Sequence, residues 1–272
     1  MINGLPGNVA TTISRHASME DRFAIIPYSL TGPEITARET VIKELPIRLI
    51  TPDKREEMIG MLKKEFSGFI SIDFSHPDAV NENAEFYCRH RLPFVMGTTG
   101  GRREELLRTV RESGNSAVIA PNMAKQIVGL QAMVAYAAEN FPGLFTGYTL
   151  SITESHQQGK ADTSGTAKAM IGSFNQMGIP FFPEEIAKIR DPQIQKGELG
   201  VPEDYLSGHG WHTYTIESKD KNVLFELKHN INGREIYAEG TLDAVLFLTR
   251  RIRKNSPGKV FSMIDVLMNT DG

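Results

Sequence analysis

Short apolar runs alternate with helical patterns through the first half of the chain, and no other feature restricts its fold as much. The runs of β-strand character lie at 23–28, 68–74, 93–96 and 117–120, and helical spacing fills 78–89 and 102–112. Strands that alternate with helices form βαβ units, because parallel strands need a crossover connection. We therefore expect an α/β fold in which a Rossmann-like parallel sheet occupies this half.

The pattern changes after Pro121-Asn122. Helices are predicted at 125–140, 164–177 and 241–253, and strand-like segments at 148–154, 212–217, 223–230 and 235–238. Strands that follow one another closely favour an antiparallel or mixed sheet. The second half is therefore expected to contain an α+β domain with a mixed sheet.

Composition excludes several classes of partner. The net charge of −3 carries no basic footprint for nucleic acid, and no apolar run reaches the roughly 18 residues of a membrane span. Cys88 is the single cysteine, so the chain cannot form an internal disulfide, which fits a reducing compartment. The histidines show no metal-binding spacing such as HExxH, so we expect no metal site.

A glycine-rich segment opens the chain and precedes a predicted helix. Gly4 permits a tight turn, Gly7 allows the backbone to approach a pyrophosphate, and Ala10 is small enough for the helix to pack on the sheet. The helix N-terminus would face the phosphates. A plain surface turn explains the same residues equally well. The dinucleotide-binding hypothesis names a loop of Gly4, Leu5, Pro6, Gly7, Asn8 and Val9.

The end of the second strand indicates which cofactor is used. The stretch from Tyr28 to Gly32 contains no carboxylate to bind the ribose diol of NADH, and Ser29 is small and polar. This favours NADPH over NADH, although Ser29 and Thr31 are also ordinary turn formers.

Two further loops follow apolar strands, where ligands bind in open α/β sheets. Glycines in such a loop allow close approach to a flat ring, and hydroxyls can bond an amide. Each loop alone is also a normal strand–helix connection. Together they add to the predicted nicotinamide site Gly97, Thr98 and Thr99, and then Pro121, Asn122 and Met123.

The densest chemistry lies at 154–167, where a strand leads through a polar loop into a helix. His156 and Lys160 can exchange protons near neutral pH if their environment tunes them. Lys160 can also hold a carboxylate by its charge, and 164–166 would offer backbone N–H groups at a helix start. A solvated loop capped by Asp162 or Thr163 is the simpler alternative.

In their order and spacing these segments resemble the dihydrodipicolinate reductase family along nearly the whole chain. The matching segments are the glycine loop, Asp73-Phe74-Ser75, Gly97-Thr98-Thr99-Gly100, the Asn122 loop, His156 to Lys160 with Ser164-Gly165-Thr166, Gly210-Trp211-His212-Thr213, Tyr237-Ala238-Glu239-Gly240 and Met263 to Leu267. Gln157 at the position of a second histidine is similar to the plant-type branch, and Asn8 replaces a basic residue of the phosphate loop.

The resemblance implies an NAD(P)H-dependent reductase that converts 4-hydroxy-tetrahydrodipicolinate, after loss of water, to tetrahydrodipicolinate for lysine synthesis. It implies a dinucleotide-binding domain over 1–121 and 241–272, and a substrate-binding and oligomerisation domain over 122–240. Lys160 would donate the proton and His156 would orient the substrate or assist proton transfer. The substrate-binding residues would be Gln157, Ser164, Gly165, Thr166 and Arg234, although Arg234 fits a structural ion pair equally well. Trp211 and His212 are interpreted as structural.

Two other functions remain open at this point. A semialdehyde dehydrogenase needs a reactive thiolate, which only Cys88 can supply, and a cofactor-binding sensor would have the fold without the chemistry. We expect a homodimer or homotetramer with a small dicarboxylate substrate. The N-terminus has no secretion signal and the first strand has only three residues, so we expect a cytoplasmic protein or one that has lost a plastid-targeting segment.

Overall fold

The computed structural model describes residues 1–160, 163–254 and 258–268, and the chain divides into two compact units. Unit 1 comprises Met1–Lys125 and Glu235–Gly272, and unit 2 comprises Gln126–Arg234. Each unit has its own hydrophobic core. The assignment of a binding role to each of the predicted domains remains a prediction.

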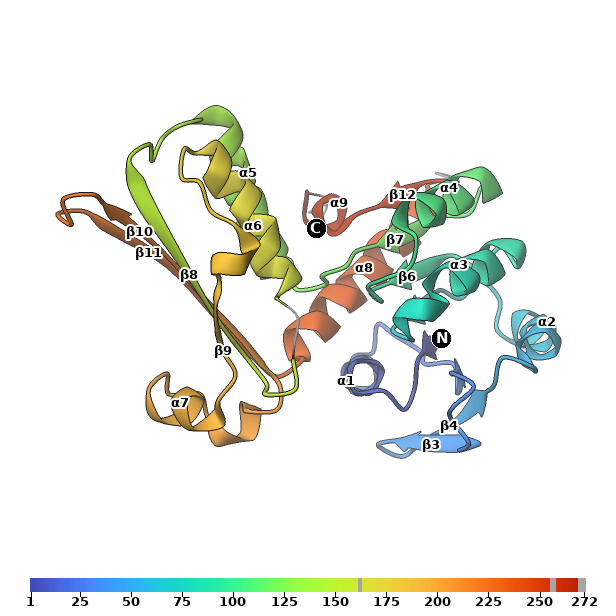
Figure 1. Cartoon of the computed structure of the whole chain (residues 1–272). Coiled ribbons are helices and arrows are strands. Elements are labelled where there is room, and N and C mark those ends of the chain that lie inside the picture. The colour runs from blue at the N-terminus through green and yellow to red at the C-terminus, as the bar shows by residue number, and fades with distance from the viewer. Residues whose placement is uncertain (161–162, 255–257, 269–272) are drawn as a thin grey trace. The chain divides into compact units, whose positions relative to one another are not determined.

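Unit 1 is built on a five-stranded sheet whose neighbouring strands all pair in parallel, as predicted. The strands, in spatial order, are β1 (Ile2–Asn3), β5 (Ser71–Asp73), β6 (Phe94–Met96), β7 (Ala117–Ile119) and β12 (Val260–Phe261) (Figure 1). The last residues of the first three strands, Asn3, Asp73 and Met96, pair in register, so their carboxyl ends form one edge.

The helices of unit 1 are α1 (Asn8–Ala17), α2 (Arg55–Glu65), α3 (Val80–Arg89), α4 (Arg103–Ser113), α8 (Glu235–Arg253) and α9 (Met263–Met268), with a 3₁₀ turn at Pro77–Ala79. Their apolar stripes face the core. In α4, for example, Leu106 and Val110 lie one turn apart and are both buried. That helix ends at Gly114, which takes the left-handed conformation (φ 69°) typical of a helix C-cap.

A small second sheet in unit 1 contains β2 (Tyr28–Leu30), β4 (Leu45–Ile50) and β3 (Glu39–Ile42), in that order. The strand predicted at 23–28 is wrong, because only Tyr28 of that run is in a strand. The N–H of Tyr28 bonds the carbonyl of Ile26 at 2.7 Å, a tight turn about Pro27. Proline has no N–H to donate to a ladder, so the strand starts after it.

The strand predicted at 235–238 is also wrong, since these residues form the first turn of α8. Ala238 and Leu242, four residues apart, are both buried and continue one helical stripe. Gly240 does not interrupt the helix. A Cβ at Gly240 would lie 1.8 Å from the carbonyl oxygen of Met123, so the glycine permits close packing against that backbone.

Unit 2 contains the mixed sheet expected from the sequence. Its order is β11 (Leu224–Asn232), β10 (His209–Ser218), β8 (Tyr148–His156) and β9 (Ala187–Ile189), with β9 parallel to β8 and the other pairs antiparallel. Helices α5 (Lys125–Asn140) and α6 (Gly165–Gln176) lie side by side on this sheet, and their apolar residues join those of β8 and β10 in one core (Figure 1).

Short elements complete unit 2: α7 (Pro192–Gly197) and 3₁₀ turns at Pro183–Glu185 and Glu203–Tyr205. Across the described ranges of both units, none of the helices combines the length and the apolar character that crossing a bilayer requires.

Candidate active site

The glycine loop of unit 1 has the backbone geometry that its sequence predicts. Gly4 has a φ of 96°, and a Cβ there would lie 2.2 Å from the carbonyl oxygen of Phe74. Gly7 is the N-cap of α1, and a Cβ there would lie 2.7 Å from the oxygen of Gly4. Ala10 is buried against the core. The loop therefore brings bare backbone to a helix N-terminus, a cradle that fits a pyrophosphate.

A pocket of about 930 Å³ opens beside this loop. It lies within unit 1 and is large enough for a nucleotide. Its lining includes Gly4, Leu5, Pro6 and Gly7 from the loop, Thr31, Gly32 and Glu34 after β2, and Arg55, Ser75, His76 and Asn83 from α2 and the segments after β5. Asn8 and Val9 begin α1 next to the loop.

The hydroxyls of Ser29 and Thr31 bond the backbone of the glycine loop at Leu5. The Ser29 hydroxyl accepts a bond from the Leu5 N–H at 3.3 Å, and the Thr31 hydroxyl donates to the Leu5 carbonyl at 2.8 Å. Ser29 is completely buried and is absent from the pocket lining. Its geometry is that of a residue that shapes the loop, rather than one that touches the ligand.

Glu34 was not identified from the sequence. Its carboxylate lies directly over Gly32, since a Cβ on Gly32 would be only 2.3 Å from the Glu34 Oε2. This places an acidic group at the end of β2, the position that selects between the two nicotinamide cofactors. The stretch from Tyr28 to Gly32 contains no carboxylate, but the turn after it brings Glu34 back to Gly32.

Asp73 organises the carboxyl edge of the sheet, a role that the sequence pattern alone does not indicate. It is fully buried and accepts bonds from Tyr87 Oη at 2.7 Å, Thr98 Oγ1 at 2.8 Å, and both Ser75 and Asn83. Burial, followed by the nearby Asp73, raises the pKa of Tyr87 well above its usual value. The phenol therefore remains a donor to the carboxylate.

The two predicted nicotinamide loops follow β6 and β7. A Cβ on Gly97 would lie 2.2 Å from the Phe74 ring, so this glycine allows the loop to approach β5 closely. Thr98 bonds Asp73, and Thr99 is the next residue. After β7, Pro121 is exposed, the Asn122 side chain accepts the Ala124 N–H at 2.9 Å, and Met123 is buried.

In unit 2, the catalytic candidates are His156, at the end of β8, and Lys160, in the loop that connects β8 to α6. His156 is the last residue of β8, and its ring lies over Gly210 of β10, where a Cβ would be 3.0 Å from His156 Cε1. A turn follows, in which the Lys160 N–H bonds the carbonyl of Gln157 at 3.0 Å. Gly210 thus provides the space in which the His156 ring lies.

The hydrogen bonds of His156 fix its tautomer. Its Nδ1 lies 3.1 Å from the carbonyl of His209, and because a carbonyl only accepts, Nδ1 carries the hydrogen. Burial, and then the charges of Lys160 and Arg190, lower the pKa of His156 to about 4 despite the opposing effect of Glu154. The ring is therefore neutral at pH 7, with an Nε2 lone pair that meets no partner among the described residues.

The loop ends at the N-terminus of α6. Ser164 is the N-cap, and its hydroxyl accepts the Thr166 N–H at 3.3 Å. Gly165 and Thr166 are the first two helical residues, so their amides belong to the helix end that favours anions. Asp162, one of the two caps proposed from the sequence, lies outside the described residues, and Thr163 precedes the observed cap.

Two other residues singled out from the sequence are Arg234, which lies between β11 and α8, and Trp211 of β10. The guanidinium of Arg234 lies beside Gly208, where a Cβ would be 3.2 Å from Arg234 Nη1. Trp211 donates from Nε1 to the side chain of Asn232 at 2.8 Å, which is a structural contact between β10 and β11.

Strand pairing also brings together donors that are far apart in sequence. Glu154, His212 and His229 are directly opposite one another on β8, β10 and β11. Among the described residues, Glu154, His156 and His212 form a group that could hold a metal ion, because their ligand atoms all lie within 4.8 Å of one another. Both oxygens of Glu154, however, already accept bonds from Arg190 and from the Ser164 N–H. The expected absence of a metal therefore stays an expectation.

Cys88 lies on α3 in the core of unit 1. Burial is the main cause of a raised pKa for its thiol, opposed by bonds from Ser113 and Asn115. A thiol with a raised pKa is a poor nucleophile at neutral pH. This environment argues against the cysteine-dependent alternative.

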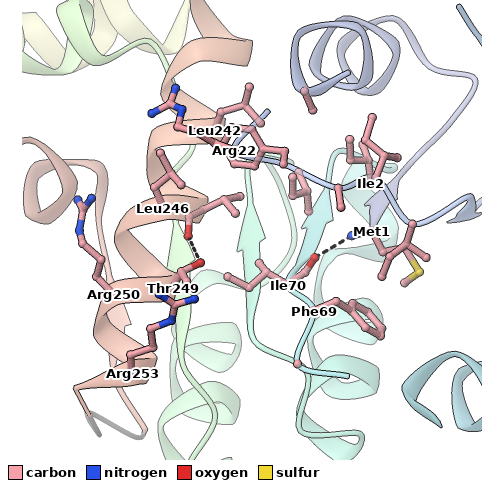
Figure 2. A pocket seen from close by; sticks show the side chains of 18 residues that line it. Met1, Ile2, Arg22, Phe69, Ile70, Leu242, Leu246, Thr249, Arg250 and Arg253 are labelled. Carbon is pink, nitrogen blue, oxygen red and sulfur yellow. Dashed lines mark hydrogen bonds between the residues drawn. The ribbon is translucent and has the colours of Figure 1, made fainter. Parts of the chain in front are cut away.

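A second pocket, of about 500 Å³, lies at the other end of the unit 1 sheet (Figure 2). It is largely apolar, and Figure 2 shows Leu242, Leu246 and Thr249 of α8 facing Ile70 and the chain start, where the Met1 amine donates to the Ile70 carbonyl at 2.9 Å. Ligands of open α/β sheets bind at the carboxyl ends of the strands. This pocket lies at the amino ends of β1 and β5, so it is not the candidate cofactor site.

Comparisons with known proteins cover nearly the whole sequence. Residues 1–123 match the family described as dihydrodipicolinate reductase, N-terminus, and residues 127–267 match dihydrodipicolinate reductase, C-terminus. A probable chloroplastic 4-hydroxy-tetrahydrodipicolinate reductase 2 from Oryza sativa is 42% identical, over 98% of this chain and 82% of its own length. The chloroplastic reductase 2 of Arabidopsis thaliana is 43% identical, over 98% of this chain and 76% of its own.

Among solved structures, a dipicolinate-bound dihydrodipicolinate reductase from Paenisporosarcina sp. TG-14 has the same fold. It superposes with a TM-score of 0.62 at 17% identity, covering 96% of this chain and 95% of that one.

Proposed function

The chain belongs to the dihydrodipicolinate reductase family, and we propose that the loop carrying His156 and Lys160 binds and protonates its substrate. The reaction is the reduction of 4-hydroxy-tetrahydrodipicolinate, with loss of water, to tetrahydrodipicolinate, in the diaminopimelate route to lysine. The observation that supports these roles is the placement of His156 and Lys160 on one loop that leads into the N-terminus of α6.

The unit 1 pocket beside Gly4 and Gly7 would hold the pyrophosphate of NAD(P)H, and the loops at Gly97 and Asn122 would hold the nicotinamide. When bound, the cofactor supplies a hydride to a ring carbon conjugated with the imine. Lys160 gives a proton to the same conjugated system, so that one hydride and one proton are added in total. His156, next to the loop that carries Lys160, orients the substrate or assists proton transfer.

The substrate is a dicarboxylate, and the chain offers two kinds of group for it. Ser164, Gly165 and Thr166 present the N-terminal end of α6, and Gln157 can donate a hydrogen bond but not a proton. Arg234 neutralises negative charge nearby. Lys160 adds a positive charge on the loop.

The test of this function is NAD(P)H oxidation, followed at the nicotinamide absorbance, with the substrate generated in situ by a dihydrodipicolinate synthase. We expect rapid oxidation that requires the synthase product. A folded protein that oxidises neither cofactor under these conditions would contradict the proposal and leave the sensor alternative.

Cofactor choice is the finer part of the proposal. The sequence favours NADPH, but the Glu34 carboxylate over Gly32 opposes a 2′-phosphate. We expect Glu34→Gln to raise the ratio of kcat/KM for NADPH to that for NADH by about tenfold, since one charge repulsion is worth roughly 1.4 kcal/mol here. The same assay with both cofactors measures it, and an unchanged ratio would remove Glu34 from the ribose site. Glu44→Gln serves as the control.

Assembly and location are also proposals. We propose a homodimer or homotetramer, supported by exposed apolar side chains in unit 2, among them Met133, Tyr136, Leu224 and Phe225. The cytoplasmic location expected from the sequence remains a proposal, and a plastid is the alternative because the rice and Arabidopsis relatives are named chloroplastic. A fluorescent fusion would distinguish them.

A further inference from the structure

A buried ion pair lies beside the loop that joins β8 to α6, which is called the candidate catalytic loop. Neither residue of the pair has a role in the proposed reaction. The pair joins Glu154, near the end of β8, to Arg190, the residue after β9. The Glu154 side chain is fully buried and the Arg190 side chain is 16% exposed. Burying two charges costs desolvation free energy. The small stabilisation that a surface ion pair gives therefore does not explain why this pair is present.

The Arg190 guanidinium ties the far side of the loop to the sheet. Its Nε donates to the carbonyl of Lys160 at 2.9 Å, and Nη1 donates to the carbonyls of Glu154 at 3.3 Å and Ile189 at 3.1 Å. Its Nη2 donates to the Glu154 carboxylate. One planar fork therefore holds the backbone of the candidate proton donor against the ends of two strands.

The Glu154 carboxylate makes the second connection. While Oε1 accepts from Arg190, Oε2 accepts the backbone N–H of Ser164 at 2.9 Å. Ser164 is the N-cap of α6. The ion pair thus links the Lys160 backbone and the start of the anion-favouring helix to a single point on β8.

A buried amide holds the near side of the same loop. Gln195 of α7 is 0% exposed, and its Nε2 donates to the carbonyl of His156 at 2.7 Å and to that of Ile189 at 3.1 Å. The segment that follows β9 therefore contacts the loop at His156 through Gln195 and at Lys160 through Arg190. Both contacts are made to backbone carbonyls and not to the side chains of His156 and Lys160.

We propose that Arg190 and Glu154 are positioning residues, which set the distance between the Lys160 ammonium and the N-terminus of α6 to match a small rigid dicarboxylate. The inference rests on the proposed function of this loop. Arg190 acts through the backbone of Lys160, and Glu154 acts through the amide of Ser164. A displacement of about 1 Å in such a constellation is enough to cost roughly 100-fold in rate.

The first experiment compares Arg190→Lys and Arg190→Gln with the wild type in the coupled reductase assay. Lysine keeps the charge but cannot reach several acceptors at once, so we expect kcat/KM for the substrate to fall about tenfold, and about 100-fold for glutamine. The KM for NADPH should stay within twofold, because the glycine loop is not touched. The matched control is Lys196→Gln on α7, which removes the exposed ion pair between Lys196 and Glu203. This variant should leave all kinetic constants unchanged.

A second measurement needs no turnover and separates this inference from the proposed function. Amide hydrogen exchange should be slow at Ser164 in the wild type and at least tenfold faster in Glu154→Ala, while the amides of β10 and β11 keep their protection. If Arg190→Gln does not fold because Glu154 is left as an unpaired buried charge, the double variant Glu154→Gln/Arg190→Met removes both charges. Wild-type kcat/KM in the folded Arg190 variants, or unchanged exchange at Ser164, would overturn the proposal.

Discussion

Burial decides the charge state of the histidines in unit 2. His156 and His212 are held neutral at pH 7, with pKa values of about 4 and about 2, chiefly because burial penalises the charged form. A neutral His156 with its hydrogen on Nδ1 is an acceptor at Nε2 and not an acid. The role of proton donor is therefore proposed for Lys160 and not for His156.

Replacing Lys160 tests this division of roles. Lys160→Ala should lower kcat by at least about 100-fold, because general acid catalysis typically contributes that much. Lys168→Ala removes an exposed lysine from α6 and should leave kcat unchanged. Turnover close to the wild type in the Lys160 variant, measured in the coupled assay, would assign the proton to another group.

The buried His212 should make the protein sensitive to acid. Below pH 6.5 the unfolded chain binds a proton at this histidine, while the folded chain, with a pKa of about 2, does not. Stability is therefore lost as the pH falls through 6.5. Between pH 6.5 and 5 we expect the wild type to lose about 2 kcal/mol more unfolding free energy than His212→Phe. Urea titrations followed by circular dichroism measure this, and His76→Asn, at an exposed histidine, should match the wild type.

At the scale of elements, close packing of backbones determines where glycine is required. Gly240 lies within α8 against the carbonyl of Met123, whereas a Cβ added to Gly172 within α6 would meet no neighbouring atom within 4 Å. Both are helical glycines, which the sequence does not distinguish. The two glycines differ in the space that the tertiary fold leaves around each of them.

These two glycines give opposite predictions. Gly240→Ala should lower the unfolding free energy by about 2 kcal/mol or more, because the backbone of Met123 must move to relieve the overlap. Gly172→Ala should raise it by up to about 1 kcal/mol, since alanine is the better helix former and the space is open. Thermal and chemical unfolding of the two variants side by side tests both, and equal effects would contradict the packing argument.

At the scale of the whole molecule, the two units divide the expected tasks, with the glycine loop in unit 1 and the His156–Lys160 loop in unit 2. For the proposed homodimer or homotetramer, the exposed apolar residues of unit 2 are the candidate interface. Leu224 and Phe225, at the start of β11, are 58% and 49% exposed. Large exposed apolar side chains gathered on one segment are typical of an interface.

Assembly through this segment is tested by adding a charge to it. We expect Leu224→Asp to shift the protein towards smaller species in sedimentation equilibrium, because an interface would have to bury the carboxylate. Met19→Asp places the same charge on an equally exposed apolar residue of unit 1 and is the control. An unchanged assembly state in Leu224→Asp would exclude this segment from the interface.

The sequence alone determined the features that depend on local periodicity and composition. The parallel strands of unit 1, the mixed sheet of unit 2 and helix α5 at Lys125–Asn140 follow from short-range patterns of apolar residues, glycine and proline. It failed at 23–28, where one turn about Pro27 outweighs an apolar run, and at 235–238, where two β-type residues lie in the first turn of a helix that buries Ala238.

Only the tertiary structure identified the residues that act across the sequence. Asp73 bonds residues of α3 and of the loop after β6, Glu34 returns to the end of β2, and Arg190 bonds the carbonyl of Lys160, thirty residues earlier. None of these contacts leaves a periodic signal, since hydrogen bonds between distant segments depend on strand order and register. The sequence therefore determined which chemical groups the loop offers, and the fold decided which buried partners hold them in place.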